Sequence, residues 1–169
     1  DGKVTVEEVQ KNYQLTIMGQ SMGDMPPVSS TTVYSLDGKI VSRKSDASSE
    51  MESPRMELAM NLVYPDKDKE LKKGDTWTAK FEADSSKGTY DLEQTYTFEG
   101  EDEVKGIKTY KITINIKESG APTDMTGTIK YWLRQDNGEV VRQTLDFKKA
   151  PVSDQIPPVD MTGTLELAD

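Results

Sequence analysis

The sequence predicts a single all-β domain over residues 1–169, folded as a curved antiparallel meander or half-open barrel of about ten strands, with room for one short helix. Three observations predict this fold class: apolar residues that alternate at a period of two, turn dipeptides between the alternating segments, and an internal repeat. With 34% hydrophobic and 30% charged residues, the chain is polar for a globular domain. This composition fits a thin layered structure better than a thick core.

The internal repeat covers about residues 13–46 and 110–147. Each copy starts with a short Tyr-x-x-Thr-Ile strand and continues through a Met/Pro loop and a second strand. A turn dipeptide then follows, Asp37-Gly38 in the first copy and Asn137-Gly138 in the second, and both dipeptides tolerate the positive φ of a tight hairpin. We therefore expect a sheet built from two related halves.

Half-buried strands are predicted wherever apolar and polar residues alternate strictly. In chain order these segments are 13–17, 77–83, 90–98, 110–116, 129–133, 141–147 and 165–167. The acidic run 99–103 separates two of them, so we interpret it as an exposed hairpin loop. The segments at 129–133 and 141–147 are expected to pair across the Asn137-Gly138 turn.

Residues 55–64 fit two patterns. Pro54 and Pro65 bracket the segment, so it is a discrete element. We favour a strand because the alternation of apolar residues is unbroken, and a short helix lying across the sheet is the alternative. The alternating residues are Met56, Leu58, Met60, Leu62 and Tyr64, whereas Met56, Met60 and Val63 have helical spacing.

The sequence Asp-Met-Thr-Gly-Thr occurs at 124–128 and again at 160–164. It could face a ligand, with Asp124 and Asp160 presented together. We favour the alternative that its Gly, at the start of a strand, permits a close backbone approach or a bulge, while Thr favours extended structure.

The chain contains neither Cys nor His, which excludes disulfides, thiolate nucleophiles and thiolate metal sites, and removes the commonest general base. Three carboxylates alternate at 66–70, but Leu71 and Trp77 stand where a calcium loop needs Gly and a bidentate acid. We therefore expect no enzymatic activity, no catalytic residues, no metal site and no cofactor.

The net charge of -9 argues against nucleic acid and anionic membrane surfaces as partners. No apolar run approaches the ~20 residues that span a bilayer, so no transmembrane segment is predicted. The chain begins with Asp1 rather than Met, which suggests that a signal segment or another upstream region has been removed.

Eight Met residues against three Phe are unusual, because flexible thioether side chains suit adaptable apolar surfaces as well as gaps in a core. Aromatic residues allow the same two interpretations, as core anchors or as walls of a pocket. The candidate ligand-binding residues are Met18, Met22, Met25, Met56, Met60, Trp77, Tyr131 and Trp132.

Three short motifs resemble a pattern found in uncharacterised secreted or lipid-anchored bacterial envelope proteins. They are a Gly-Asp-x-Trp strand start (Gly74, Asp75, Trp77), a Val-x-Gly-x-x-x-Tyr-x-Ile hairpin (Val104, Gly106, Tyr110, Ile112) and a Gly-x-Val turn (Gly138, Val140). Some such proteins are similar to periplasmic lipoprotein carriers, whose curved antiparallel sheet holds acyl chains against short helices. This chain departs from that pattern, because its sequence shows no clear helix to plug the concave face.

The resemblance implies an extracytoplasmic protein, periplasmic or at the cell surface, or lipid-anchored through a removed N-terminus. We expect a non-catalytic protein that binds or carries a lipid or another hydrophobic molecule on a concave sheet face. The alternative is a structural or interaction module of the envelope that binds a protein or a glycan and has no internal pocket. A Met- and Trp-lined cavity would favour the first, and two well-filled sheet faces would favour the second.

Overall fold

The computed structural model describes residues 3–10, 13–17, 20–24, 28–35, 40–45, 53–65, 70–151 and 157–167. Within these ranges the chain forms eleven strands and one short helix. The strands are β1 (Lys3–Gln10), β2 (Tyr13–Ile17), β3 (Gln20–Asp24), β4 (Val28–Ser35), β5 (Ile40–Ser45), β6 (Thr76–Phe81), β7 (Asp91–Val104), β8 (Ile107–Ser119), β9 (Thr126–Arg134), β10 (Val140–Ala150) and β11 (Val159–Leu167). The helix is α1 (Pro54–Ala59).

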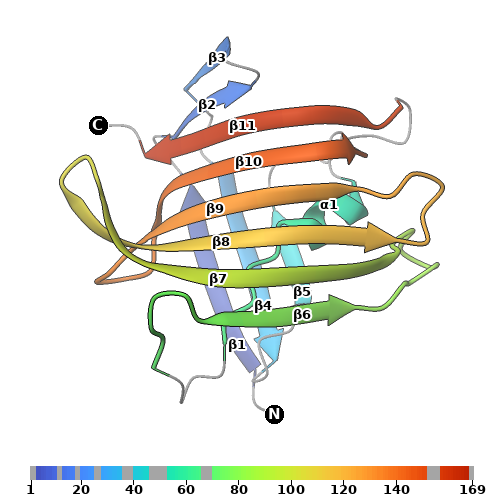
Figure 1. The fold of residues 1–169 in the computed structure, drawn as a ribbon, viewed down its shortest axis with the longest axis horizontal. Coiled ribbons are helices and arrows are strands. Elements are labelled where there is room, and N and C mark those ends of the chain that lie inside the picture. Colours follow the sequence, from blue (N-terminus) through green and yellow to red (C-terminus); the bar gives the residue numbers. More distant parts are fainter. Residues whose placement is uncertain are drawn as a thin grey trace.

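The described strands make two antiparallel sheets. The large sheet has the order β3-β2-β11-β10-β9-β8-β7-β6, and the small sheet has the order β1-β4-β5. From β6 to β11 each strand pairs with the next one in sequence, so this part of the large sheet is a simple meander. Figure 1 shows the small sheet crossing behind the large one.

The fold is mostly β, as the sequence predicts, with an open antiparallel sheet and almost no helix. The two related halves are not confirmed. The first copy of the repeat covers β2 to β5, which are divided between the two sheets, whereas the second copy covers β8 to β10, which are neighbours in one sheet. The prediction of about ten strands is not confirmed either, since the described residues form eleven.

The favoured strand at 55–64 is wrong, because residues 54–59 form α1. Pro54 occupies the start of the helix, where its fixed φ suits the first turn and its missing N–H is no loss. The helical hydrogen bonds run from Glu57 N to Ser53 O and from Met60 N to Met56 O, each 3.0 Å long. Residues 61–65 then continue outside both sheets, so the alternation of apolar residues extends over a helical turn and a non-strand segment.

The hairpin-loop interpretation of 99–103 is also wrong, because β7 continues to Val104. The turn lies at Lys105 and Gly106, which both have positive φ (51° and 79°), the conformation of a two-residue hairpin. The pairing of β7 with β8 shifts register between Phe98 and Gly100 and then continues to the turn. Asn137-Gly138 does connect β9 and β10, whereas Asp37-Gly38 lies outside the described residues.

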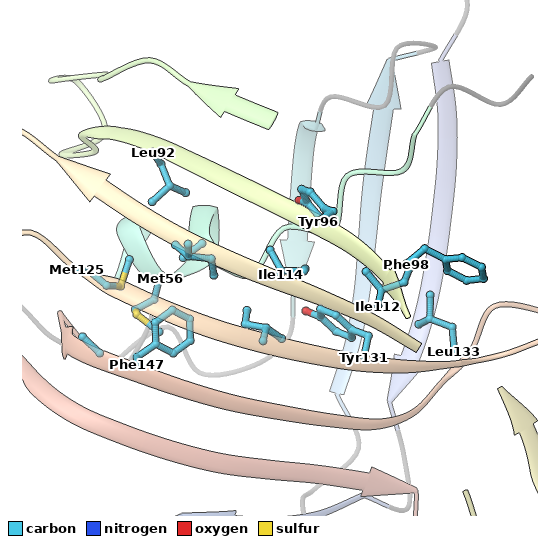
Figure 2. Packing of buried hydrophobic residues seen from close by; sticks show 14 residues of the cluster. Met56, Leu92, Tyr96, Phe98, Ile112, Ile114, Met125, Tyr131, Leu133 and Phe147 are labelled. Carbon is cyan, nitrogen blue, oxygen red and sulfur yellow. The ribbon is translucent and has the colours of Figure 1, made fainter. Parts of the chain in front are cut away.

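One face of the large sheet, here called the inner face, holds the main core. Burial alternates along β7 and β8, and their buried positions face each other across the strand pair, as in Tyr96 opposite Ile114. The core cluster joins these strands to β9, β10 and α1, and Figure 2 shows how its side chains gather on that face. Its members are Met56, Ala59, Leu92, Tyr96, Phe98, Ile112, Ile114, Ile116, Met125, Ile129, Tyr131, Leu133, Phe147 and Ala150.

The opposite face, here called the outer face, carries a row of polar side chains. Thr97, Thr113, Lys130, Thr144 and Thr164 are direct cross-strand neighbours from β7 to β11, in the alternate positions to the buried ones. Thr is a residue that strands favour on a half-exposed surface. A row of hydroxyl groups and one ammonium therefore crosses the sheet on this side.

Candidate functional site

The inner face is covered by residues 53–65, here called the strap, which consist of α1 and the chain on either side of it. Met56 is 8% exposed and Ala59 is fully buried, and both belong to the core cluster. Leu58, Leu62 and Val63 pack against the cluster from the same segment. The strap thus supplies the second layer that a one-sided apolar sheet needs.

Sheet side chains hold the strap through its backbone carbonyl groups. Gln94 Nε2 donates to Leu58 O at 3.3 Å and to Ala59 O at 2.8 Å. Tyr131 Oη donates to Met60 O at 3.2 Å. These carbonyl groups lie at the end of α1, where the last C=O groups of a helix lack their i+4 partners, so the side chains act as caps; Leu58 O also accepts a bond from Asn61 N at 3.3 Å.

The next part of the strap is held in the same way. Trp77 Nε1 donates to Val63 O at 2.8 Å, and Val63 N donates to Tyr96 Oη at 3.1 Å. The single hydroxyl proton of Tyr96 serves either Asn61 O, 3.0 Å away, or Gln94 Oε1. The rings of Trp77 and Tyr96 are stacked, with centroids 5.0 Å apart. Side chains from β6, β7 and β9 therefore bind a nearly continuous row of strap carbonyl groups.

These polar groups are buried. Gln94 and Tyr96 are fully buried, and Tyr131 and Gln143 are each 6% exposed. Gln143 Nε2 donates to Tyr131 Oη at 3.0 Å, which leaves the Tyr131 proton for the strap. Burial raises the pKa of Tyr96 to about 12, so this phenol stays neutral and keeps its proton at physiological pH. Buried donors of this kind are costly unless they have acceptors.

An ion pair fixes the start of the strap. Arg55 Nε donates to Glu118 Oε1 at 2.8 Å, a second bond joins Arg55 Nη2 to Glu118 Oε2, and Arg55 Nη2 also donates to Thr123 O at 2.8 Å. Glu118 Oε2 accepts a further bond from Met125 N at 3.0 Å. The hydrogen bonds to Glu118 raise the pKa of Arg55. The guanidinium also lies 5.1 Å from the ring centroid of Tyr90.

Three of the predicted ligand-binding residues meet at this site. Met56 and Tyr131 belong to the inner-face core, and Trp77 packs against it. Met60 lies in the strap, and its side chain is largely outside the core because the residue is 37% exposed. These predicted residues therefore come from both the sheet side and the strap side of the site, and their role in binding a ligand stays a prediction.

Trp132 lies apart from this group, in a second cluster with Val104 and Val141. Its Nε1 donates to Asp102 Oδ2 at 2.9 Å, and the cations of Lys111 and Arg142 lie 5.1 and 5.2 Å from a ring centroid of the indole. Trp132 opposes Arg142 on the outer-face side of β9.

The remaining predicted methionines cannot be placed at the site. Met18 and Met25 lie outside the described residues, and Met22 belongs to β3, where only the backbone is described.

Sequence reasoning missed Gln94, Gln143 and the Arg55–Glu118 pair. A signal for Gln94 exists, since it occupies a buried position in the alternation between Leu92 and Tyr96. A polar residue at a core position indicates a buried hydrogen bond. The partner could not be identified, because residues 55–64 were interpreted as a strand.

The Gly of the repeated Asp-Met-Thr-Gly-Thr fragment permits a close approach in the first copy. A Cβ atom on Gly127 would lie 2.3 Å from Cδ1 of the buried Phe147 ring. The two aspartates bind local backbone, with Asp124 Oδ1 accepting from Ala121 N and Asp160 Oδ1 from Lys149 N. These contacts agree with the structural interpretation of the fragment.

Searches against protein-family models, curated proteins and solved structures find no match. Within the described ranges, no group of three or more acidic side chains is arranged to hold a metal ion. In the same part of the chain, no helix has the length and apolar character to cross a membrane. The inner face offers apolar contact and neutral hydrogen-bond donors.

Proposed function

We propose that this protein is a non-catalytic binding protein of the bacterial envelope, which binds or carries a lipid or another hydrophobic molecule on the inner face of its large sheet. One observation carries the proposal. The apolar inner face is covered by a strap that belongs to neither sheet and is held by side chains. The strap can therefore leave the inner face without breaking the ladder of hydrogen bonds between strands.

The Arg55–Glu118 pair anchors the start of the strap, but the forces that hold residues 56–63 are of a size that a ligand can replace. Each neutral hydrogen bond contributes about 1 kcal/mol net, and burial of a side chain such as Met56 contributes about 1.5–3 kcal/mol. An acyl chain that covers the same apolar surface recovers the burial term, at about 0.8 kcal/mol for each CH₂ group. Exchange between strap and ligand is thus energetically feasible.

The apolar surface extends beyond the strap. Partly buried residues surround the core cluster on β6, β10 and β11 and in the chain before β6, and they supply a rim for a ligand longer than the strap. They include Phe81, Leu145, Met161 and Leu71. The outer face carries a smaller apolar cluster around Trp132, so the larger apolar surface for a hydrophobic ligand is the inner face.

The resemblance to lipid-carrying envelope proteins supports the same function and is the basis for the extracytoplasmic location. Those carriers place short helices against a curved antiparallel sheet, and in this chain the short helix α1 packs against the inner-face core. As part of this proposal, we infer that the large sheet is curved and half-open and that it is built from two related halves.

The second candidate function is an envelope module that binds a protein or a glycan through its surface. The polar outer face favours it, because Thr97, Thr113, Thr144 and Thr164 present hydroxyl groups from neighbouring strands beside Lys130. On this alternative the strap is a permanent part of the core.

Native mass spectrometry of the protein purified from bacterial cells distinguishes the two functions. The carrier function predicts an extra mass that solvent extraction removes and that returns on incubation with phospholipids or fatty acids. A protein that keeps its bare mass through both treatments would contradict the carrier function and favour the module.

A further inference from the structure

The inner face contains several hydrogen-bond donors among its apolar side chains. Gln94, Tyr131 and Trp77 each donate to a strap carbonyl group, and Tyr96 lies within bonding distance of another. Carbonyl oxygens only accept hydrogen bonds. The side-chain donors of the sheet therefore bind the strap through its backbone carbonyl groups.

These donors lose their acceptors when the strap leaves. In a site closed to water, each unsatisfied donor weakens binding of the new occupant by about tenfold. A pure hydrocarbon recovers the apolar contacts but satisfies none of the donors, so it competes poorly with the strap. A ligand that has carbonyl oxygens as well as apolar arms recovers both the apolar contacts and the hydrogen bonds to the donors.

The position of the donors further restricts the class of ligand that fits the inner face. In Figure 2 the hydroxyl groups of Tyr96 and Tyr131 lie between two apolar groups of the core. Met56, Met125 and Phe147 lie toward one end, and Phe98, Ile112 and Leu133 lie toward the other. The arrangement suits a molecule whose polar linkage is flanked by apolar arms on both sides.

We propose that the ligand of the inner face is a lipid with acyl ester linkages, whose carbonyl oxygens replace those of the strap on Gln94, Tyr131, Trp77 and Tyr96. This inference rests on the proposed carrier function. It adds that the strap is an internal stand-in for the ligand, since it presents the same acceptors to the same donors. Strap and ligand therefore compete for one site.

The test uses two lipids that differ only in the carbonyl groups. Dioleoylglycerol has two ester linkages, and the matched dioleyl ether of glycerol has the same arms without carbonyl oxygens. Binding of each to the full chain is measured by native mass spectrometry, with tryptophan fluorescence as a second readout because Trp77 lies at the site. We expect the diester to bind at least tenfold more tightly than the diether.

Variants assign the preference to the donors. Gln94→Met keeps the length of the side chain and removes the donor, so the diester and diether affinities should approach each other. Thr113→Ala on the outer face is the control and should leave the ratio unchanged. If Gln94→Met fails to fold by circular dichroism, Tyr131→Phe removes a different donor with less change in shape.

The outcomes separate the two proposals. Equal binding of diester and diether would overturn the carbonyl inference and leave the carrier function standing. Failure of both lipids to bind would overturn the inference together with the carrier function. Binding of a synthetic peptide with the sequence of residues 53–65, in the absence of lipid binding, would also overturn it and would make the site a peptide site.

Discussion

The inner and outer faces of the large sheet are formed by the same strands, but their polar side chains differ in exposure to water. On the outer face, Thr and Lys side chains meet water. On the inner face, Gln94 and Tyr96 are fully buried and depend on the strap for partners. Polar groups on a wet surface are easily replaced, whereas buried ones are costly without a partner. Buried donors therefore indicate what the inner face is built to hold, and changes there should have the larger effects.

The largest difference should appear between two ion pairs. Arg55–Glu118 is buried at the start of the strap, with side-chain exposures of 14% and 2%, whereas Lys80–Glu93 is exposed at 73% and 48%. Arg55→Met leaves the buried Glu118 carboxylate without its cation, so we expect a loss of about 3–5 kcal/mol in the free energy of unfolding. Urea unfolding at neutral pH measures it.

Lys80→Met is the matched control. Because solvent screens the exposed pair, its loss should leave the free energy of unfolding nearly unchanged. Similar losses for the two variants would show that the strap is not anchored by Arg55.

Gly127 offers the next test, since its Cβ position is already occupied by the ring of Phe147. Gly127→Ala must displace a fully buried aromatic side chain, which should cost about 3 kcal/mol. The adjacent Thr126 is exposed, so Thr126→Ala should cost about 0.5 kcal/mol or less. Thermal unfolding of both variants measures the difference, and a tolerated Gly127→Ala would contradict the close packing of β9 against β10.

Alkaline pH should weaken the contact between the strap and the sheet. The pKa of Tyr96 is raised by burial to about 12 from an ordinary value of 10, so the folded state favours the neutral phenol. The resulting stability is complete below pH 10 and is lost as the pH rises from 10 to 12, roughly 3 kcal/mol in total. Unfolding measured across this window should show the loss in the natural chain and a smaller one in Tyr96→Phe. Identical pH slopes in the two proteins would contradict the burial of this hydroxyl.

The smallest effect concerns Trp132, near the outer face. Its Nε1–H bond holds the pKa of the exposed Asp102 carboxyl below its usual value, with help from the backbone N–H of Glu103. Trp132→Phe removes the donor, so the Asp102 pKa should rise toward the ordinary range. Carboxyl carbon NMR titration measures it. An unchanged pKa would show that the indole does not contact Asp102 in solution.

The sequence predicted the strands well where burial alternates, because a period of two leaves a direct trace in the order of residues. The cleanest alternation, 110–116, lies in the middle of β8. The strap was misinterpreted because its partners are remote in sequence: Gln94 Nε2 and Ala59 O are 35 residues apart. Local patterns record which positions are buried, but they do not record which backbone group a buried polar side chain binds.

The acidic run 99–103 shows the same limit. Its charge indicates exposure, which is correct for Glu101, Asp102 and Glu103, but exposure does not end a strand. The turn was set by the positive φ of Lys105 and Gly106 instead. Residue chemistry predicted one group of ligand-binding residues, and the fold divides it: Met56, Trp77 and Tyr131 lie at the inner-face core, and Trp132 lies in the second cluster.

Hydrogen–deuterium exchange of the strap amides, with and without dioleoylglycerol, tests the central claim that the inner face is a ligand site covered by the strap. Our account predicts faster exchange in residues 56–63, including the Val63 N–H that now donates to Tyr96, together with unchanged or stronger protection of β7, β8 and β9. Strap amides that exchange at the same rate with the lipid present would contradict it, because the strap would then be a fixed part of the core.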